Sequence, residues 1–331
     1  MWRYILKRLG YMLLLLFLVS VTSFVVIQLP PGDYLTSYIR QLEASGQPVD
    51  QSEIEALKRQ YGLDLPVTAQ YFKWAAGLLR GDFGRSLQWN RPVRELIAER
   101  LGLTLVVNLG AVLFTYAIAI AIGAYSATHQ YSVADYVFTV IGFLGLAVPG
   151  FLFALILMVV FNNVFGLSVG GLFSPEYAQA AWSWGKAVDL LKHLPIPVII
   201  IGTAGAAGLI RVMRGSLLDE LGKQYVVTAR TKGLSETKIL FKYPVRVAVN
   251  PVISTIGWIL PGLISGGTIV AIVLSLPTVG PLLYRALLSQ DMYLAGSLLM
   301  LLCALTIVGT FISDILLVWL DPRIRFEGGS R

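Results

Sequence analysis

The sequence predicts an all-α polytopic membrane protein with six transmembrane helices and both termini in the cytoplasm. Of the 331 residues, 56% are hydrophobic and 14% are charged, a composition far from that of a soluble domain. Charge-free runs long enough to cross a bilayer recur along the chain. The formal net charge of +7 is concentrated in a few loops, which assigns those loops to the cytoplasmic side and makes nucleic-acid binding a poor explanation of the charge.

The first predicted span, residues 1–30, begins with three cations and no acid. It continues without a charge from Tyr11 to Leu29, a length that suits one crossing. A cleaved signal peptide also has a basic start and an apolar core. This run is long for such a core and ends in two prolines rather than in a small-residue cleavage site. We therefore expect a retained helix whose N-terminus is cytoplasmic.

Residues 31–100 form the second predicted part, an extracytoplasmic helical segment. Nine acidic and nine basic residues lie between Pro30 and Arg100, so this part cannot lie in hydrocarbon. Helical spacing gives it two apolar stripes, formed by Ile54, Leu57 and Tyr61 and by Val67, Tyr71, Trp74, Ala75 and Leu78. Two interpretations of the stripes stay open: packing on the outer ends of the spans, or docking of an external partner.

Residues 101–331 contain the other five predicted spans, near 101–128, 136–165, 194–210, 250–274 and 292–313. The fifth span is rich in residues that weaken helices: Gly257, Pro261, Gly262, Gly266 and Gly267. Breaks in a transmembrane helix persist only where protein or a water-filled cavity surrounds them. These residues therefore indicate either close helix packing through small side chains or the lining and gate of a pathway.

A basic stretch separates the fourth and fifth spans. Eight Lys or Arg residues and three acids lie between Arg211 and Arg246, which places the stretch in the cytoplasm. Within it, residues 225–232 predict a short helix, Gly233 a break, and Ser235 the cap of a second helix. We expect a helix, a glycine and a helix outside the bilayer.

The sequence lacks the motifs of nucleotide-binding loops, metal sites and proton relays. Its two Gly-Lys pairs, at Gly185 and Gly222, lack the upstream glycine and the following Ser or Thr of a nucleotide-binding loop. Two distant histidines and a single cysteine give no metal site. The central parts of the predicted spans carry no Asp, Glu, Lys, Arg or His, which disfavours proton coupling. We therefore expect no catalytic residue, no metal and no cofactor bound by this chain, and energy supplied by another protein. A stand-alone secondary carrier or channel is the main alternative, and a scaffold for a membrane complex is a third.

The basic stretch resembles the coupling-helix motif of ABC importer permeases. The match runs through VTARTKG and LSETKILFKYPVRVAVNPVIS, and it is closest to the branch that transports oligopeptides, dipeptides, nickel chelates, opines and oligosaccharides. Of the general motif, EAA followed by three residues and glycine, only Ala229 and Gly233 are kept. Four further stretches also resemble that branch: WRYILKRLGYMLLLLFLVSVTSFVVIQLPPGD, GLLRGDFGRSLQWNRPV, LPTVGPLLYRALLSQD and LDPRIR.

The resemblance implies a multi-pass permease subunit in a prokaryotic plasma (inner) membrane, with residues 101–331 as the permease core and coupling helices at about 224–246. It implies a second homologous permease subunit, two cytoplasmic ATPases that bind ATP and Mg, an extracytoplasmic solute-binding protein and surrounding lipid as partners. The ATPase-coupling residues that it indicates are Val226, Thr228, Ala229, Arg230, Lys232, Gly233, Leu234 and Lys238. We expect Val226, Ala229 and Leu234 to supply an apolar contact, and the segment from Leu276 to Asp291 to form an outer gate. At Gly233 we expect the two helices to meet at an angle that a β-carbon would crowd. The solute class stays open.

Overall fold

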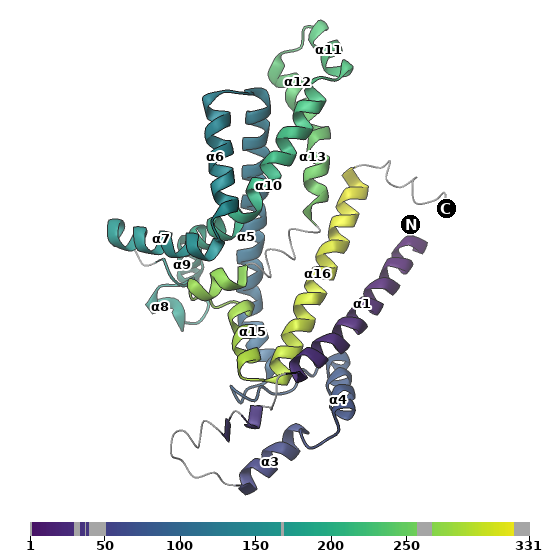
Figure 1. Cartoon of the computed structure of the whole chain (residues 1–331), viewed down its shortest axis with the longest axis vertical. Helices are drawn as coiled ribbons and strands as arrows, with labels where there is room; N and C mark the ends of the chain where they lie inside the picture. The colour runs from purple at the N-terminus through teal and green to yellow at the C-terminus, as the bar shows by residue number, and fades with distance from the viewer. Residues whose placement is uncertain are drawn as a thin grey trace. The chain divides into compact units, whose positions relative to one another are not determined.

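The computed structural model describes residues 2–29, 34–36, 38–39, 51–166, 169–256 and 267–320, and these residues form helices and connecting loops without a β-strand (Figure 1). The first helices along the chain are α1 (Trp2–Gln28), α3 (Gln51–Tyr61), α4 (Val67–Arg80), α5 (Val93–Thr128), α6 (Val133–Ala147), α7 (Gly150–Phe165) and α8 (Pro175–Ala178). The others are α9 (Trp184–His193), α10 (Pro195–Leu221), α11 (Gln224–Thr231), α12 (Glu236–Lys242), α13 (Pro244–Ser254), α15 (Val279–Leu288) and α16 (Met292–Leu320).

Four helical segments are long and apolar enough to cross a membrane: Gly10–Gln28, Val93–Thr128, Pro195–Leu221 and Met292–Phe311. Helices α6 and α7 pass the same test as a pair bent by 107°. The bend follows from Pro149, which has no amide hydrogen for helix pairing and disfavours helical geometry at Val148. The described residues therefore confirm the predicted all-α membrane protein and contain four candidate spans, or five if the bent pair is one span, while the predicted number of six stays a prediction. The predicted fifth span includes residues 257–266, which lie outside the described residues.

One compact unit contains residues 1–103 and 278–307. Its core joins α1, α4, the start of α5, α15 and α16 through buried side chains that include Phe24, Trp74, Leu96, Leu282 and Leu298. The aromatic stripe of α4 lies against α1, with ring centroids 5.4 Å apart for Phe24 and Tyr71 and 5.9 Å apart for Phe24 and Trp74. The packing interpretation therefore holds for Tyr71 and Trp74. On the same helix, Phe72 is exposed.

The other unit contains residues 104–277 and 308–331. Its long helix α10 packs on α13 and α6, and its core includes Met213, Leu217, Ala248 and Val252. Small residues let the helices of this unit approach closely, as is common in membranes. A β-carbon on Gly123 of α5, for example, would lie 2.6 Å from that of Met213. The predicted domain boundaries at residues 30 and 100 stay a prediction. Each compact unit is built from segments that are distant in the chain, so the units are not the consecutive domains of that prediction.

Candidate functional site

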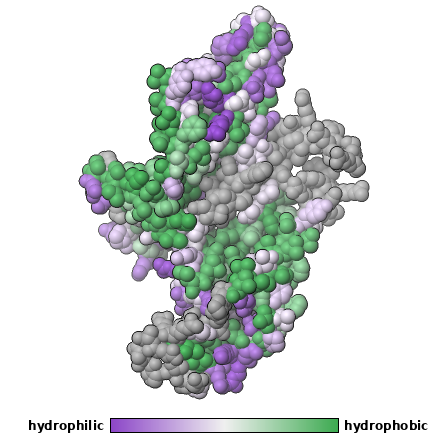
Figure 2. Space-filling model, in the orientation of Figure 1, coloured by the Kyte–Doolittle hydropathy of each residue, from purple (hydrophilic) through white to green (hydrophobic). Residues whose placement is uncertain are grey.

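The basic stretch folds as two short helices, α11 and α12, joined by a turn (Figure 1). Val226, Ala229 and Ile239 form a small buried core between them, and Leu234 and Tyr243 pack against it. The core arises from spacing, because Val226 and Ala229 stand three residues apart on one helix face. We call these two helices and their turn the coupling pair. Figure 2 shows hydrophilic residues gathered at this end of the unit.

Gly233 terminates α11 with a backbone φ of +74°. This left-handed conformation costs little for glycine and strains residues that carry a β-carbon. We expected a β-carbon here to be crowded between the two helices. That reason is wrong, because no heavy atom lies within 4 Å of the position that the carbon would take. The backbone conformation, rather than lack of space, is what favours glycine.

Polar contacts tie the coupling pair together and to the end of α10. Arg230 donates to both carboxylate oxygens of Glu236, with Nε to Oε1 at 2.8 Å and Nη2 to Oε2 at 3.2 Å. This guanidinium lowers the pKa of Glu236. The hydroxyl of Tyr225 donates to Glu220, and burial together with that carboxylate raises the pKa of Tyr225. Helix α12 also packs on α13, and α13 packs on α10, so the pair is joined to the long helices of its unit.

The predicted coupling residues differ in exposure. Val226 and Ala229 are 0% and 6% exposed, and they hold the pair together instead of offering a direct contact. Leu234 is half-buried, and five residues are exposed: Thr228, Arg230, Lys232, Gly233 and Lys238. Sequence reasoning missed two exposed apolar side chains, Val227 and Phe241. The helical register of α11 could have revealed Val227, which points away from the face shared by Val226 and Ala229.

The predicted gate residues are covered only in part. Gly257, Pro261, Gly262 and Gly266 lie outside the described residues. Gly267 begins a described helical stretch, and a β-carbon there would lie 3.7 Å from Ile201 of α10. This distance is an ordinary van der Waals contact. The pathway and gate assignment stays a prediction.

Asp291 was named in the sequence analysis only as the end of the predicted outer gate, which begins at Leu276. It is 0% exposed and caps the start of α16, accepting a hydrogen bond from the amide of Leu294 at 3.2 Å. It also accepts from the hydroxyl of Ser86 at 2.5 Å and from the amide of Gln88 at 3.1 Å. Burial raises the pKa of Asp291, although these donors oppose the shift. An acid directly before an apolar run is the signal of a helix cap and could have indicated this role.

Metal ligation finds no support in the part of the chain that the structure describes, where no three His, Cys, Asp or Glu side chains are grouped as a metal ion requires. The described site consists of helix surfaces and of side chains held by hydrogen bonds.

Known proteins match the chain over nearly its full length. Residues 119–326 match the family described as binding-protein-dependent transport system inner membrane component, and residues 1–108 match its N-terminal counterpart. The chain is 34% identical to the oligopeptide transport system permease protein AppB of Bacillus subtilis, over 98% of this chain and 99% of that protein. It is 34% identical to the oligopeptide transport system permease protein OppB of Haemophilus influenzae, over 98% and 100% of the two chains. The peptidoglycan transport system permease protein YejB of Agrobacterium fabrum is 30% identical, over 98% of each chain.

These matches confirm the family resemblance and the multi-pass location in a prokaryotic inner membrane. Permeases of this family work with a solute-binding protein and with ATPase subunits, in which ATP is hydrolysed. The chain therefore belongs to the family of binding-protein-dependent transport system inner membrane components, and it is a permease subunit of an ABC importer.

Proposed function

We propose that this chain forms half of the pathway through which oligopeptides enter the cell, with a second, homologous permease subunit forming the other half. The printed names of two relatives at 34% identity, both oligopeptide permeases, support this solute class. Oligosaccharides were the other class that the family resemblance left open. The relative whose name includes peptidoglycan is more distant, at 30% identity, so peptides are the preferred solute.

We infer that the coupling pair seats on one of two cytoplasmic ATPases, which bind ATP and Mg. The observation that carries this proposal is the packing of α12 on α13 and of α13 on α10. A displacement of the pair would therefore reach helices that cross the membrane. Val227 and Phe241 would supply the apolar contact, while Arg230, Lys232 and Lys238 would set the orientation, because all five side chains are exposed. Val226 and Ala229 would act indirectly, by holding the two helices together.

The proposed topology has six crossings and both termini in the cytoplasm. Four candidate spans and one bent pair support five of these crossings. The sixth would run through residues 257–266, where Gly257, Pro261, Gly262 and Gly266, with Gly267, would line the pathway or its gate. Residues 31–100 and the segment from Leu276 to Asp291 would then face outward, toward the solute-binding protein. The excess of cations beside the coupling pair supports this orientation.

Gly233→Asp tests the coupling role. An aspartate must adopt the left-handed backbone at this position, so the turn should deform while the transmembrane helices remain inserted. We expect peptide uptake by the reconstituted transporter to fall at least tenfold and to separate from ATP hydrolysis stimulated by the binding protein. Both rates are measured in the same vesicles.

Gly222→Asp is the matched control. Gly222 is also exposed, but its φ of −82° is available to any residue. This variant should transport at nearly the wild-type rate. Wild-type uptake and wild-type stimulated hydrolysis in Gly233→Asp would contradict the proposal.

A further inference from the structure

A pocket of about 300 Å³ lies between α6 and α10, beside the end of α5. Its lining combines two kinds of chemistry. Arg211, Arg214 and polar groups that include Tyr131 and Asp135 contribute to it, and so do the apolar side chains of Phe143 and Leu146. The established permease function assigns no role to this pocket.

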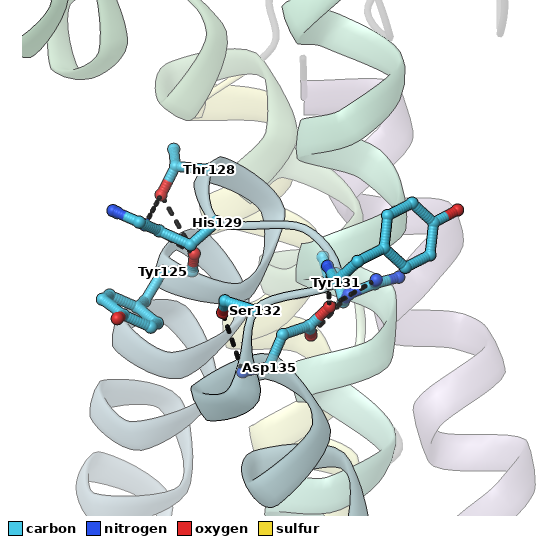
Figure 3. A network of polar contacts seen from close by, with 7 residues as sticks. Tyr125, Thr128, His129, Tyr131, Ser132 and Asp135 are labelled. Carbon is cyan, nitrogen blue, oxygen red and sulfur yellow. Dashed lines mark hydrogen bonds and ion pairs between the residues drawn. The ribbon is translucent and has the colours of Figure 1, made fainter.

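The carboxylate of Asp135 fixes and neutralises one of the two arginines. Asp135 is 3% exposed and accepts from Arg214 at both oxygens, with Nε to Oδ1 at 3.1 Å and Nη2 to Oδ2 at 2.9 Å. The amide of Tyr131 donates to the same carboxylate at 3.0 Å, and the hydroxyl of Ser132 accepts from the amide of Asp135 at 3.1 Å (Figure 3). This network holds Arg214 in place, and its ion pair with Asp135 neutralises its positive charge.

Arg211 provides the charge that remains. No carboxylate of the described residues pairs with it. Its guanidinium carbon instead lies 5.1 Å from the centre of the Phe143 ring. An arginine on a membrane helix is costly unless an anion or water meets it, and an aromatic face compensates only in part. The pocket therefore presents one uncompensated cation above an apolar wall.

The surroundings of the pocket match the boundary between hydrocarbon and headgroups. Arg214 lies seven residues before the end of α10 at Leu221, or about 10 Å at the rise of an α-helix. Beyond that end lies the basic stretch, and the inference rests on the proposed topology, which puts this stretch in the cytoplasm. On α6, Val140, Ile141 and Leu144 are each more than half exposed, and Figure 2 shows hydrophobic residues gathered over α6 and α7. Apolar surface of this kind suits lipid chains.

We propose that this pocket binds an anionic phospholipid of the cytoplasmic leaflet, with the lipid phosphate on Arg211 and an acyl chain along Phe143 and Leu146. Basic pockets between membrane helices on the cytoplasmic side have the charge and depth that such headgroups need. An apolar helix of another subunit could cover the wall, but it would leave Arg211 without an anion. Charge complementarity therefore selects the lipid.

Native mass spectrometry of the complete transporter tests the proposal. The complex is equilibrated with equal amounts of phosphatidylglycerol and phosphatidylcholine, and the retained lipids are counted. We expect the wild type to retain phosphatidylglycerol preferentially and Arg211→Ala to lower this preference about fivefold, the factor expected for removal of one basic residue at a membrane surface. Arg211→Lys should keep most of the preference. Arg246→Ala is the control, since Arg246 is an exposed cation in the same basic stretch but outside the pocket.

Gly142→Leu tests the shape of the pocket without changing its charge. A β-carbon on Gly142 would find only Ala207 within 4 Å, at 3.8 Å, so the rest of the leucine side chain would take up pocket volume. This variant should also retain less phosphatidylglycerol, and it serves as the test if Arg211→Ala does not assemble. Equal retention of the two lipids by the wild type, or unchanged retention by both variants, would overturn the proposal. Tyr136 also lines the pocket, and a photo-reactive residue can replace it. Crosslinks from this position that reach a protein subunit and never a lipid would also overturn the proposal.

Discussion

The core around Trp74 and the coupling pair are both helical, but they are stabilised on different scales. In the first, thirteen buried residues from five helices surround one another, and Asp291 anchors a loop through buried hydrogen bonds. In the second, three buried residues form the whole core. A large core makes substitutions costly to folding. A small core contributes little to the folding of the whole protein. Substitutions there should therefore impair coupling more than folding.

Trp74→Ala should give the largest loss of stability. Trp74 is 2% exposed, and removal of a buried tryptophan costs about 3–5 kcal/mol through lost contacts and the cavity left behind. The unfolding temperature of the purified transporter measures the effect. Phe72→Ala on the same helix is the control, because Phe72 is 68% exposed and should change that temperature little. Equal shifts for the two variants would remove the basis of the comparison.

Asp291→Ala should have the next largest effect. It leaves the buried Ser86 hydroxyl without its acceptor, at about 1–3 kcal/mol for one unsatisfied buried group, and it removes the weaker, partly exposed bond from the Gln88 amide. Asp291→Asn retains an acceptor oxygen and should cost less. A loss from Asn as large as that from Ala would show that the hydrogen bonds do not carry the anchor.

The same residue predicts a dependence on pH. The pKa of Asp291 is raised in the folded chain, so the folded state binds more protons than the unfolded state between the ordinary and the raised value. The free energy of unfolding should therefore fall as pH rises through this interval. Unfolding temperatures measured across the acidic range test the sign, and Asp291→Asn should flatten the slope.

Ile239→Ala should give the smallest change in unfolding temperature and a large change in transport. Ile239 is 1% exposed, yet its core contains only two other buried side chains. We expect the helices of the coupling pair to loosen and peptide uptake to fall several-fold while the rest of the protein stays folded. Thr237→Ala, an exposed change on the same helix, is the control. A drop in unfolding temperature as large as that of Trp74→Ala would show that the two regions unfold as one cooperative unit, against this comparison.

Patterns within a single helix were readable from the sequence. Hydropathy indicated the long helices, and Gly233 with Ser235 indicated the break and the second helix of the coupling pair. Contacts between distant segments were not readable in this way. The hydrogen bond from Ser86 to Asp291 joins residues 205 positions apart, and the pair of Asp135 with Arg214 joins residues 79 positions apart. No local period encodes such pairings, because each depends on how separate helices pack.

The proposed coupling residues were assigned from the sequence as a segment, not as a surface. Charge and family motif located the stretch, but they did not separate Val226, which is buried, from Val227, which is exposed. That distinction requires the partner helix, since α12 decides which face of α11 is covered. The gate assignment of residues 257–266 remains a hypothesis that rests on their glycine and proline content.

Gly296 of α16 meets the ring of Trp74 so closely that a β-carbon would lie 2.8 Å from the ring atom Cζ2. The tryptophan ring is rigid, so neither position can grow unless the other shrinks. Evolutionary drift at these two positions should therefore be correlated. Among related permeases, a larger residue in place of Gly296 should accompany a smaller residue in place of Trp74, and a designer who exchanges α4 between relatives would need to exchange the facing turn of α16 with it.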